Sequence, residues 1–474
     1  MRENVGKVKR KRVKKTQMNK KRSAFSGKIG YVLSAAGASV GLGNIWRFPY
    51  LAAKYGGGIF LLVYIILALT FGYTMIVAES ALGRMTRKSP VGAFRSFAKG
   101  KKVGWLSFGG WINAIIPVLI VPYYSVIGGW VVKYLFEYTR GNGSKLAEDG
   151  YFSGFISSGG ATEICFVIFC MFTLVIIYAG VQNGIERVSK IMMPILIVLS
   201  VIIAIYSVTR PGAIEGVKYF LVPNVKNFSW MTVVAAMGQM FYSLSIAMGI
   251  LVTFGSYMRK DTSIEDSTRN VEIFDTAIAM MAGLMIIPAV FAFSGGDPDT
   301  LQAGPSLMFI TIPKVFANMG FGTAVGILFF VLVLFAAVTS SIALTESAVS
   351  TFEDELGWGR KKATVLTGVI MITLGTLSCL GYGPLDFVKI IGMQFLDFFD
   401  FLTNSVMMPI AALMTSLLVS RVIGVDKIEE EIRHGESTFR RKKIFVVMIK
   451  YLCPIFALII LASSVANAFG WIAM

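Results

Sequence analysis

Long stretches without a charged residue dominate the chain. Five of them approach the roughly 20 residues that a helix needs to cross the hydrocarbon core of a bilayer. They are Ile59–Ala78, Ile164–Val181, Ile191–Thr209, Gly320–Thr345 and Tyr451–Ile472. The pattern is typical of an all-α polytopic membrane protein, because helices satisfy their own backbone hydrogen bonds in lipid.

Charged breaks divide this pattern into eleven predicted transmembrane helices. Their expected bounds are 27–51, 58–83, 104–136, 162–180, 185–208, 229–257, 271–294, 320–352, 362–381, 385–419 and 446–472. A basic arm, 1–26, precedes the first span, and a charged linker, 421–445, precedes the last segment, 446–474. The charge density of residues 421–443 predicts a short solvated helix there.

Basic residues indicate the orientation, because Lys and Arg accumulate in cytoplasmic loops. Basic clusters lie at 84–102, 360–362 and 440–443, all on the same side as the N-terminus. The N-terminus is therefore predicted to be cytoplasmic, and an odd number of spans places Met474 outside. We expect a multi-pass protein of the plasma membrane, with no need for a cleavable signal peptide because the segment after the arm is long enough to span.

The composition agrees with this class and excludes others. The 474 residues are 55% hydrophobic and only 15% charged, whereas a soluble chain carries roughly 25% charged residues. Mean hydropathy is +0.69. The four cysteines lie in apolar segments without a CxxC pair, and His434 is the single histidine. A disulfide scaffold, a histidine-rich metal centre and a Ser-His-Asp triad are therefore not expected.

The net charge of +18 is concentrated in the basic arm. Residues 1–28 hold 12 Lys or Arg and one acid, Glu3. Because this arm directly precedes a span and lacks interleaved aromatic residues, we expect it to contact anionic lipid and not nucleic acid.

Two spans contain clusters of small residues that would loosen a helix at mid-membrane depth. The first carries Gly37–Gly43, with the sequence GASVGLG, and the sixth carries Ser243–Gly249, with the sequence SLSIAMG. Breaks five spans apart predict an inverted 5+5 repeat, 27–208 and 209–420, with a binding site where the discontinuous helices 1 and 6 meet. Tight helix packing through small residues would explain the same spacing.

The residues around the first break resemble a family signature. Gly41–Tyr50, GLGNIWRFPY, followed by Gly56–Gly58, is similar to the signature of the neurotransmitter:sodium symporter family. Further matches are Glu79 before Gly83 and Arg84, Tyr123 and Tyr124, Gly238 and Gln239, Ser256–Asp261, Thr339–Ser341 and Glu353–Glu355. The resemblance covers roughly residues 25–470. It implies a LeuT-type fold, membership of the bacterial amino-acid transporter branch, and a transporter rather than an enzyme.

The resemblance implies two sodium sites, and hard cations of this kind bind oxygen ligands. The site that shares the substrate would use Ser39, Asn44, Ser243 and Asp275. The second site would use Gly37, Val40, Ala336, Thr339 and Ser340. The alternative is that Thr339 and Ser340 serve helix packing.

Asp275 stands where many relatives have asparagine and recruit chloride. A fixed carboxylate supplies the negative charge from the protein, and Ala279, one turn on, offers no second acid or hydroxyl. We therefore expect no chloride requirement. The alternative is that Asp275 lies near the cytoplasmic end and is solvated.

The resemblance also implies the substrate class. Gly41 replaces the aspartate that pairs with the amine in monoamine-transporting relatives, and Tyr124 corresponds to the tyrosine that binds the substrate carboxylate. An apolar pocket without counter-charge indicates a neutral, bulky hydrophobic or aromatic α-amino acid. The implied lining is Ser39, Gly41, Gly43, Ile120, Tyr124, Ile127, Tyr242, Ser243, Ser245, Ala247, Met248, Ser340 and Leu344.

Gates and supporting residues follow from the same resemblance. The outer gate would pair Arg47 with Asp400, or alternatively Asp397, and Tyr242 would close over the substrate. The inner gate would pair Arg22 with Asp354, supported by Tyr257. The predicted supporting residues are Glu79, Gln239, Gly184 and Pro194. The last two are selected because proline removes a backbone donor, so unwinding of span 5 would open a water path to the inner sodium site. The alternative is a static kink.

The leading hypothesis is a sodium-coupled symporter that imports its amino acid by alternating access, as a monomer or homodimer. Proton coupling through Asp275 or Glu79 is the first alternative, and a non-transporting amino-acid sensor is the second. An ion channel is disfavoured, because no ring of selectivity residues is visible.

Overall fold

The computed structural model describes residues 22–98, 104–294 and 304–471. The basic arm up to residue 21, the lysines of 99–103 and Met474 lie outside the described residues. The described chain is helical, and its two isolated β-bridges, Gly57 with Pro223 and Ile390 with Met393, do not extend into strands.

The helices of the first half run in the following order. They are α2 (Lys28–Ser39), η1 (Gly43–Arg47), α3 (Phe48–Lys54), α4 (Gly58–Leu67), η2 (Ala68–Gly72), α5 (Tyr73–Thr86), α6 (Pro90–Ala98), η3 (Gly104–Ser107), α7 (Phe108–Thr139), α8 (Gly143–Leu146), α9 (Tyr151–Ser157), α10 (Gly160–Tyr178), η4 (Val181–Glu186) and α11 (Arg187–Val208).

The second half continues with a similar alternation of long and short helices. They are α12 (Ala213–Leu221), η5 (Val225–Asn227), α13 (Trp230–Ser243), α14 (Ile250–Tyr257), α15 (Ile264–Ser294), η7 (Leu307–Thr311), α16 (Ile312–Ala317), α17 (Gly322–Leu356), α18 (Arg360–Leu380), α19 (Phe395–Asp400), η8 (Phe401–Met407), α20 (Met408–Leu417), η9 (Leu418–Ile423), α21 (Val425–Arg433), α22 (Lys442–Val447), η10 (Met448–Leu452) and α23 (Cys453–Ala468).

Within the described part of the chain, nine helices are long and apolar enough to span a bilayer. Spans 1 and 6 are the two predicted spans missing from these nine, because both are interrupted. The first is divided into α2 and η1–α3, and the second into α13 and α14. The arrangement is consistent with the eleven predicted spans.

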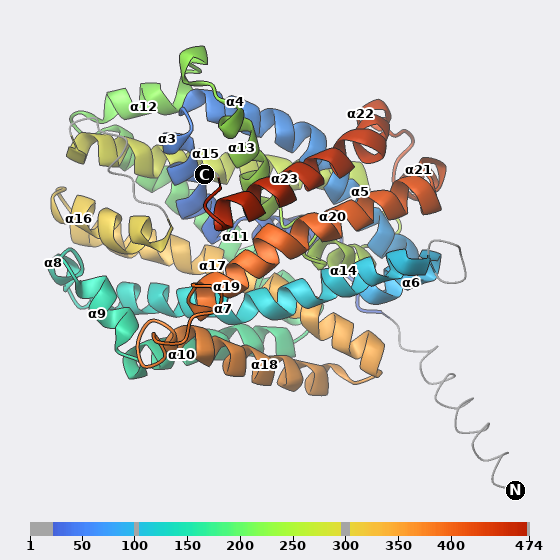
Figure 1. The fold of residues 1–474 in the computed structure, drawn as a ribbon, viewed down its shortest axis with the longest axis horizontal. Coiled ribbons are helices and arrows are strands. Elements are labelled where there is room, and N and C mark those ends of the chain that lie inside the picture. Colours follow the sequence, from blue (N-terminus) through green and yellow to red (C-terminus); the bar gives the residue numbers. More distant parts are fainter. Residues whose placement is uncertain (1–21, 99–103, 295–303, 472–474) are drawn as a thin grey trace, which may run out of the picture.

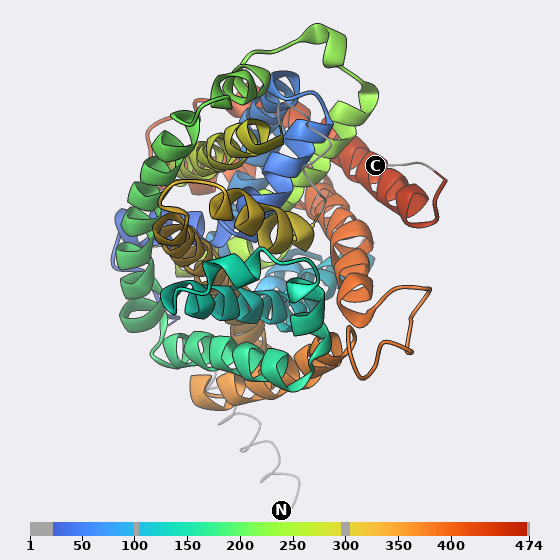
Figure 2. The ribbon, with the colours of Figure 1, turned by 90° about the vertical axis from the view of Figure 1, so that its left-hand side faces the viewer.

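The long helices run along the longest dimension of the molecule (Figure 1). The helices α6, α21 and α22 lie at one end, and the short helices α8, α12 and α16 lie at the opposite end (Figure 1). Figure 2 looks onto the molecule from the second of these ends. For brevity, the end that carries α6 and α21 is called the Arg22 end, and the other is called the α16 end.

The backbone at the two breaks leaves the helical conformation for a few residues. Val40, after α2, is extended, with φ −74° and ψ 96°. In the second break Ser245 and Ala247 have positive φ values of 53° and 60°. Such a conformation strains any residue with a Cβ, so the surrounding contacts must hold this segment in place.

Glycines bring α5 and α14 into backbone contact. A Cβ on Gly83 would clash with the carbonyl of Val252, and a Cβ on Gly255 would clash with the carbonyl of Ser80. The absence of side chains at these two positions therefore fixes α14, the second half of the interrupted sixth span, directly against span 2.

Two sequence expectations differ from the structure. Span 10 was predicted from residue 385, but its helix begins at Phe395, because the apolar residues before it form a turn-rich segment that contains Gly383, Pro384 and Gly392. The linker does contain a helix, α21, but one face of it is buried instead of solvated. Ile428 and Ile432 are fully covered on that face.

Candidate functional site at the two helix breaks

A central cavity of about 30 Å³ lies where the two breaks meet. Its walls come from both breaks, α7 and α17. The lining residues are Ala38, Ser39, Gly41, Leu42, Gly43, Asn44, Ile120, Tyr124, Tyr242, Ser243, Ser245, Met248, Ile250, Ser340 and Leu344. No charged side chain is among them.

Most residues predicted to bind substrate line this cavity, with two exceptions. Ile127 lines a second cavity nearer the α16 end. Ala247 is turned to Glu79, whose Oε1 accepts its backbone N–H at 2.9 Å. Ala38, Leu42 and Ile250 line the cavity although the sequence reasoning did not select them. The first two lie within the GASVGLG segment, so their position next to the glycines was the available signal.

Gly41 and Gly43 line the central cavity at places where a Cβ would meet other side chains. A Cβ on Gly41 would lie 2.6 Å from Ser340 Oγ and 3.2 Å from the Tyr124 hydroxyl, and a Cβ on Gly43 would lie 2.5 Å from the Tyr242 ring. The Leu42 N–H donates to the Tyr124 hydroxyl at 3.3 Å. The unwound backbone and the Tyr124 hydroxyl thus meet at one point of the cavity wall, where Gly41 leaves space for a ligand.

Asp275, on α15, forms the centre of a buried polar cluster. Its Oδ1 accepts hydrogen bonds from Asn44 Nδ2 at 2.8 Å and from Ser243 Oγ at 2.9 Å. Its Oδ2 accepts one from the Tyr64 hydroxyl at 2.8 Å. Asp275 is 0% exposed, so the alternative that it is solvated is wrong.

The structure therefore brings together three of the four residues predicted for the first sodium site. Ser39, the fourth, lines the central cavity, and its own hydroxyl donates to Ala35 O at 3.2 Å. Tyr64 was missed, because nothing around it in an apolar span distinguishes it from a packing residue. The cluster holds a carboxylate and two hydroxyls, and the amide oxygen of Asn44, which accepts the Gly41 N–H at 3.1 Å, lies on the same side chain. Oxygen ligands of these kinds suit a hard cation.

Ser340, on α17, faces three backbone carbonyls of the first break. Its Oγ lies 3.4 Å from Gly37 O, 3.2 Å from Ala38 O and 3.4 Å from Val40 O. A hydroxyl carries a single proton, so it can satisfy only one of these three oxygens at a time. The Thr339 hydroxyl lies 3.2 Å from Ala336 O. The Ala38 carbonyl also accepts the Ser245 hydroxyl at 3.0 Å, so the Gly37 and Val40 carbonyls are the acceptors left beside Ser340, which fits a bound cation.

The second cavity, of about 420 Å³, lies on the α16 side of the first and is called the outer cavity. Arg47, Asp397 and Asp400 all line it, and Tyr242 lines both cavities. The Tyr242 ring therefore forms part of the wall between them. The guanidinium of Arg47 lies over this ring, 5.4 Å from its centroid.

Arg47 and Asp400, the predicted outer-gate pair, do not form an ion pair among the described residues. Asp400 instead accepts hydrogen bonds from Asn404 Nδ2 at 2.6 Å and from the Tyr123 hydroxyl at 3.2 Å. Asp397 accepts one from the Tyr382 hydroxyl at 3.2 Å. The basic and acidic residues share the outer cavity without closing it.

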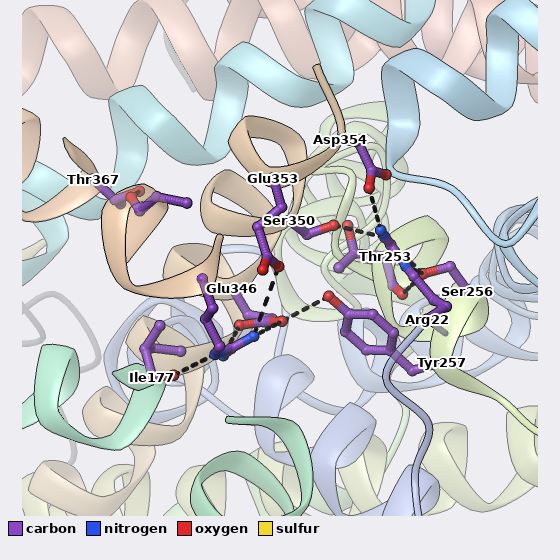
Figure 3. A network of polar contacts seen from close by, with 12 residues as sticks. Arg22, Ile177, Thr253, Ser256, Tyr257, Glu346, Ser350, Glu353, Asp354 and Thr367 are labelled. Carbon is purple, nitrogen blue, oxygen red and sulfur yellow. Dashed lines mark hydrogen bonds and ion pairs between the residues drawn. The ribbon is translucent and has the colours of Figure 1, made fainter. Parts of the chain in front are cut away.

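The predicted inner-gate residues are in contact at the Arg22 end. Arg22 forms an ion pair with Asp354 at 2.5 Å, and its guanidinium donates to Ser350 Oγ at 2.8 Å and to Ser256 Oγ at 3.0 Å. Figure 3 shows Arg22 between Asp354 and Tyr257. The guanidinium also lies 5.0 Å from the centroid of the Tyr257 ring.

The inner network extends further than the sequence reasoning found. The Tyr257 hydroxyl donates to Glu346 at 2.7 Å (Figure 3). Arg360 pairs with the same carboxylate at 2.6 Å. Arg360 also donates to the carbonyl of Ile177 at 2.8 Å. Spans 4, 8 and 9 and the end of α14 are therefore joined at the Arg22 end, while the outer cavity remains open space.

Two of the four predicted supporting residues, Gln239 and Glu79, contact the breaks. Gln239 Nε2 donates to Gly43 O at 3.0 Å, and Glu79 holds the Ala247 N–H. Gly184 lies in the π-helical turn η4, and Pro194 lies inside α11. Because the whole segment is helical in this structure, the water path through span 5 stays a prediction.

Comparisons with known proteins agree with this architecture. The model of the sodium:neurotransmitter symporter family matches residues 22–142 and 151–470. The chain is 36% identical to the uncharacterized sodium-dependent transporter YhdH of Bacillus subtilis, over 87% of this chain and 91% of that protein. It is 32% identical to an uncharacterized sodium-dependent transporter of Haemophilus influenzae, over 95% of this chain and 99% of that protein.

A solved structure matches at the level of the whole fold. The crystal structure of MhsT in complex with L-phenylalanine superposes with a TM-score of 0.83 and 35% sequence identity, and the match covers 94% of this chain and 100% of MhsT. The predicted LeuT-type fold is confirmed. Since the family model spans almost the whole described chain, the protein belongs to the sodium:neurotransmitter symporter family, whose members are membrane transporters and not enzymes.

Proposed function

We propose that this sodium-dependent symporter imports a neutral, hydrophobic or aromatic α-amino acid by alternating access, without a requirement for chloride. The observation that carries the proposal is the central cavity. Asn44 and Ser243 of the Asp275 cluster line it together with Ser340, and no charged residue does. Unwound amides next to the Tyr124 hydroxyl suit a carboxylate, and the apolar residues Ile120, Met248 and Leu344 suit an uncharged side chain.

Two sodium ions would hold the two helix breaks against α15 and α17. In the proposal, Asn44, Ser243, Asp275 and the Ser39 carbonyl bind one sodium ion beside the substrate carboxylate. The carbonyls of Gly37, Val40 and Ala336, with the hydroxyls of Thr339 and Ser340, bind the other. The surplus of acceptor oxygens around Ser340 supports the second assignment.

The Asp275 carboxylate would replace chloride as the balancing negative charge. It is buried among neutral donors, Tyr64, Asn44 and Ser243, and none of them neutralises it. A buried carboxylate without a counter-charge is costly, and a sodium ion next to it removes that cost.

A bulky substrate requires the central cavity to expand beyond about 30 Å³. Met248 lines the cavity and is an unbranched, flexible side chain that adapts to different shapes. Tyr242 lines the wall to the larger outer cavity, so its rotation would join the two spaces. The similarity to MhsT, which was solved with L-phenylalanine, supports a substrate of this size.

The open outer cavity and the closed Arg22 network correspond to an outward-facing state that approaches occlusion. In this proposal the Arg22 end faces the cytoplasm and the α16 end faces outward. Inward sodium movement is favoured by about 2.3 kcal/mol per charge per 100 mV, and this would drive uptake.

The test is uptake of a mixed amino-acid pool by proteoliposomes that contain the full chain. External sodium is exchanged for potassium or choline, and chloride for gluconate. Uptake that needs sodium, ignores chloride and depletes one hydrophobic amino acid is the expected result. Accumulation driven by a pH step without sodium would overturn sodium coupling, and binding without accumulation would indicate a sensor.

A further inference from the structure

The helix α2 begins without a cap of its own. Its N-cap residue is Gly27, which has no side chain, and the first turn contains no acidic residue. The free N–H groups and the partial positive charge of a helix start favour a nearby anion. α2 is also the element that ends at the first break, so the way its start is held affects the cavity.

Glu186, on span 5, places a carboxylate beside the start of α2, and it binds Ser26, the residue before the N-cap. Its Oε2 accepts the Ser26 backbone N–H at 2.9 Å, and its Oε1 accepts the Ser26 hydroxyl. Lys190, one turn further along span 5, donates to Glu186 Oε1 at 2.6 Å. Glu186 is 2% exposed, so these bonds are shielded from water.

Two more contacts tighten this junction. Gln182 Nε2, on the same π-helical turn, donates to Ala24 O at 2.7 Å. On the opposite side, Gly30 leaves the space that the Glu186 carboxylate fills, because a Cβ there would clash with Glu186 Oε1. The contacts of Glu186 and Gln182 with residues 24–30 are called the α2–η4 clasp.

The clasp joins two segments that the transport cycle would have to separate. η4 ends at Glu186 and contains Gly184, the glycine of the predicted water path. α2 runs from the clasp to the carbonyls of Gly37 and Val40, which face Ser340. The clasp is separate from the Arg22 network, since its acid is on span 5, whereas that network pairs Arg22 with span 8.

We propose that Glu186 is a positioning residue that couples α2 to η4, so that α2 swings away and span 5 loosens as one event. The inference rests on the alternating-access function proposed above. When α2 moves away, the π-helical turn loses the partner that holds its last residue. Conversely, an intact clasp keeps the carbonyls of the first break against Ser340 and favours sodium binding.

The experiment is hydrogen exchange by mass spectrometry on the full chain in lipid nanodiscs, with sodium titrated against potassium. Glu186→Gln weakens the clasp from the span 5 side, and Gly30→Ala pushes the carboxylate away from the α2 side. Glu215→Gln is the matched control, because it removes a carboxylate from an exposed pair with Lys218 on α12. Glu186→Asp, which keeps the charge, tests for rescue.

In both clasp variants we expect exchange to rise together in peptides 24–39 and 181–190, by at least about fivefold, which is the lower end of typical coupling between sites. The sodium concentration that half-protects peptide 24–39 should rise by a similar factor. The control should match the parent protein, and Glu186→Asp should recover part of the protection.

Three results would overturn the clasp. They are no change in either peptide, a rise in one peptide without the other, and faster exchange throughout the chain with an unchanged sodium midpoint, which would indicate a merely structural role. Failure of the proposed function is distinguishable, because the parent protein would then show neither sodium-dependent protection nor uptake, whereas coupled exchange of the two peptides can still be measured without sodium.

Discussion

Gln239 joins the two interrupted helices, because its Nε2 donates to the carbonyl of Gly43 across the site at 3.0 Å. Gly43 is the first residue after the break in span 1, and Gln239 lies one turn before the break in span 6. The Gly43 carbonyl, which also accepts the Phe48 N–H within η1, thus has a second partner on the other broken helix. A change at either break should therefore affect ligand binding at both.

Gly41→Ala should abolish uptake. The new Cβ would lie 2.6 Å from Ser340 Oγ, closer than van der Waals contact allows, and would displace the hydroxyl that faces the carbonyls of the first break. Substrate and sodium affinities should both fall at least about tenfold, equivalent to about 1.4 kcal/mol. Scintillation proximity binding would measure both.

The control for this substitution is Gly154→Ala on α9, where an added Cβ meets nothing within 4 Å. That variant should bind and transport as the parent protein does. Retained sodium affinity in Gly41→Ala would contradict the shared geometry of Gly41 and Ser340.

Ser340→Ala should weaken sodium binding while leaving the fold intact. The substitution removes the hydroxyl that lies within 3.4 Å of the Gly37, Ala38 and Val40 carbonyls. We expect a sodium midpoint at least about tenfold higher, because hydrogen bonds and ligands next to charge are worth roughly 1.5–3 kcal/mol. Ser200→Ala, a buried serine on α11 that bonds only its own helix at Leu196 O, should leave the midpoint unchanged.

Asp275→Asn should convert uptake from chloride-independent to chloride-stimulated. Asparagine keeps an oxygen near Asn44 and Ser243 but removes the buried negative charge. In gluconate, uptake should fall at least about tenfold, and added chloride should restore part of it. Asp261→Asn, at an exposed pair with Arg259, is the matched control. Undiminished uptake in gluconate would show that the carboxylate does not balance the cation.

Arg84→Met should destabilise the protein strongly. Arg84 is 0% exposed and donates to Glu431 Oε1 at 2.7 Å and to Thr262 O at 2.5 Å. Its loss leaves the buried carboxylate of Glu431 with only the more distant, exposed Lys260 and His434, at 3.7 Å and 3.9 Å. Removing one partner of a buried pair costs about 3–5 kcal/mol. Thermal unfolding in detergent should show a large drop that Arg84→Met with Glu431→Leu largely reverses.

The comparison for that substitution is Arg259→Met, which breaks the exposed pair with Asp261. Exposed pairs contribute about 0–1 kcal/mol, so its unfolding temperature should hardly move. Equal losses in the two variants would mean that burial of the Arg84 pair is not what stabilises α21.

The hydrophobic pattern predicted the spans well because each one is a long apolar run between charged residues. It failed at the start of span 10, where Leu385, Phe387 and Val388 are as apolar as a helix but lie in a turn-rich segment. Hydropathy cannot distinguish these cases, since it ignores backbone conformation. It also failed for α21, because the buried partner of Glu431 is Arg84, 347 residues away in the sequence.

Some site residues could likewise be identified from the sequence, and others could not. Those within the signature, such as Gly41 and Asn44, could be placed from the sequence because the family resemblance assigns them a role. Tyr64 could not, because its role depends on the distance between its hydroxyl and Asp275, which only the folded chain sets. For the same reason the sequence did not show that Glu186 reaches the start of α2.

The glycine contacts of α5 and α14 make the two interrupted helices unequal in how they are anchored. α14 is attached to span 2 backbone to backbone, at Gly83 and Gly255, and no side-chain rotation can release it. The start of α2 is held mainly by side chains, through Glu186, Gln182 and the Arg22 network, and by one backbone hydrogen bond, from the Phe25 N–H to Tyr257 O. α14 can therefore move only together with span 2. The start of α2, by contrast, is released once a few side chains change rotamer and one backbone hydrogen bond breaks.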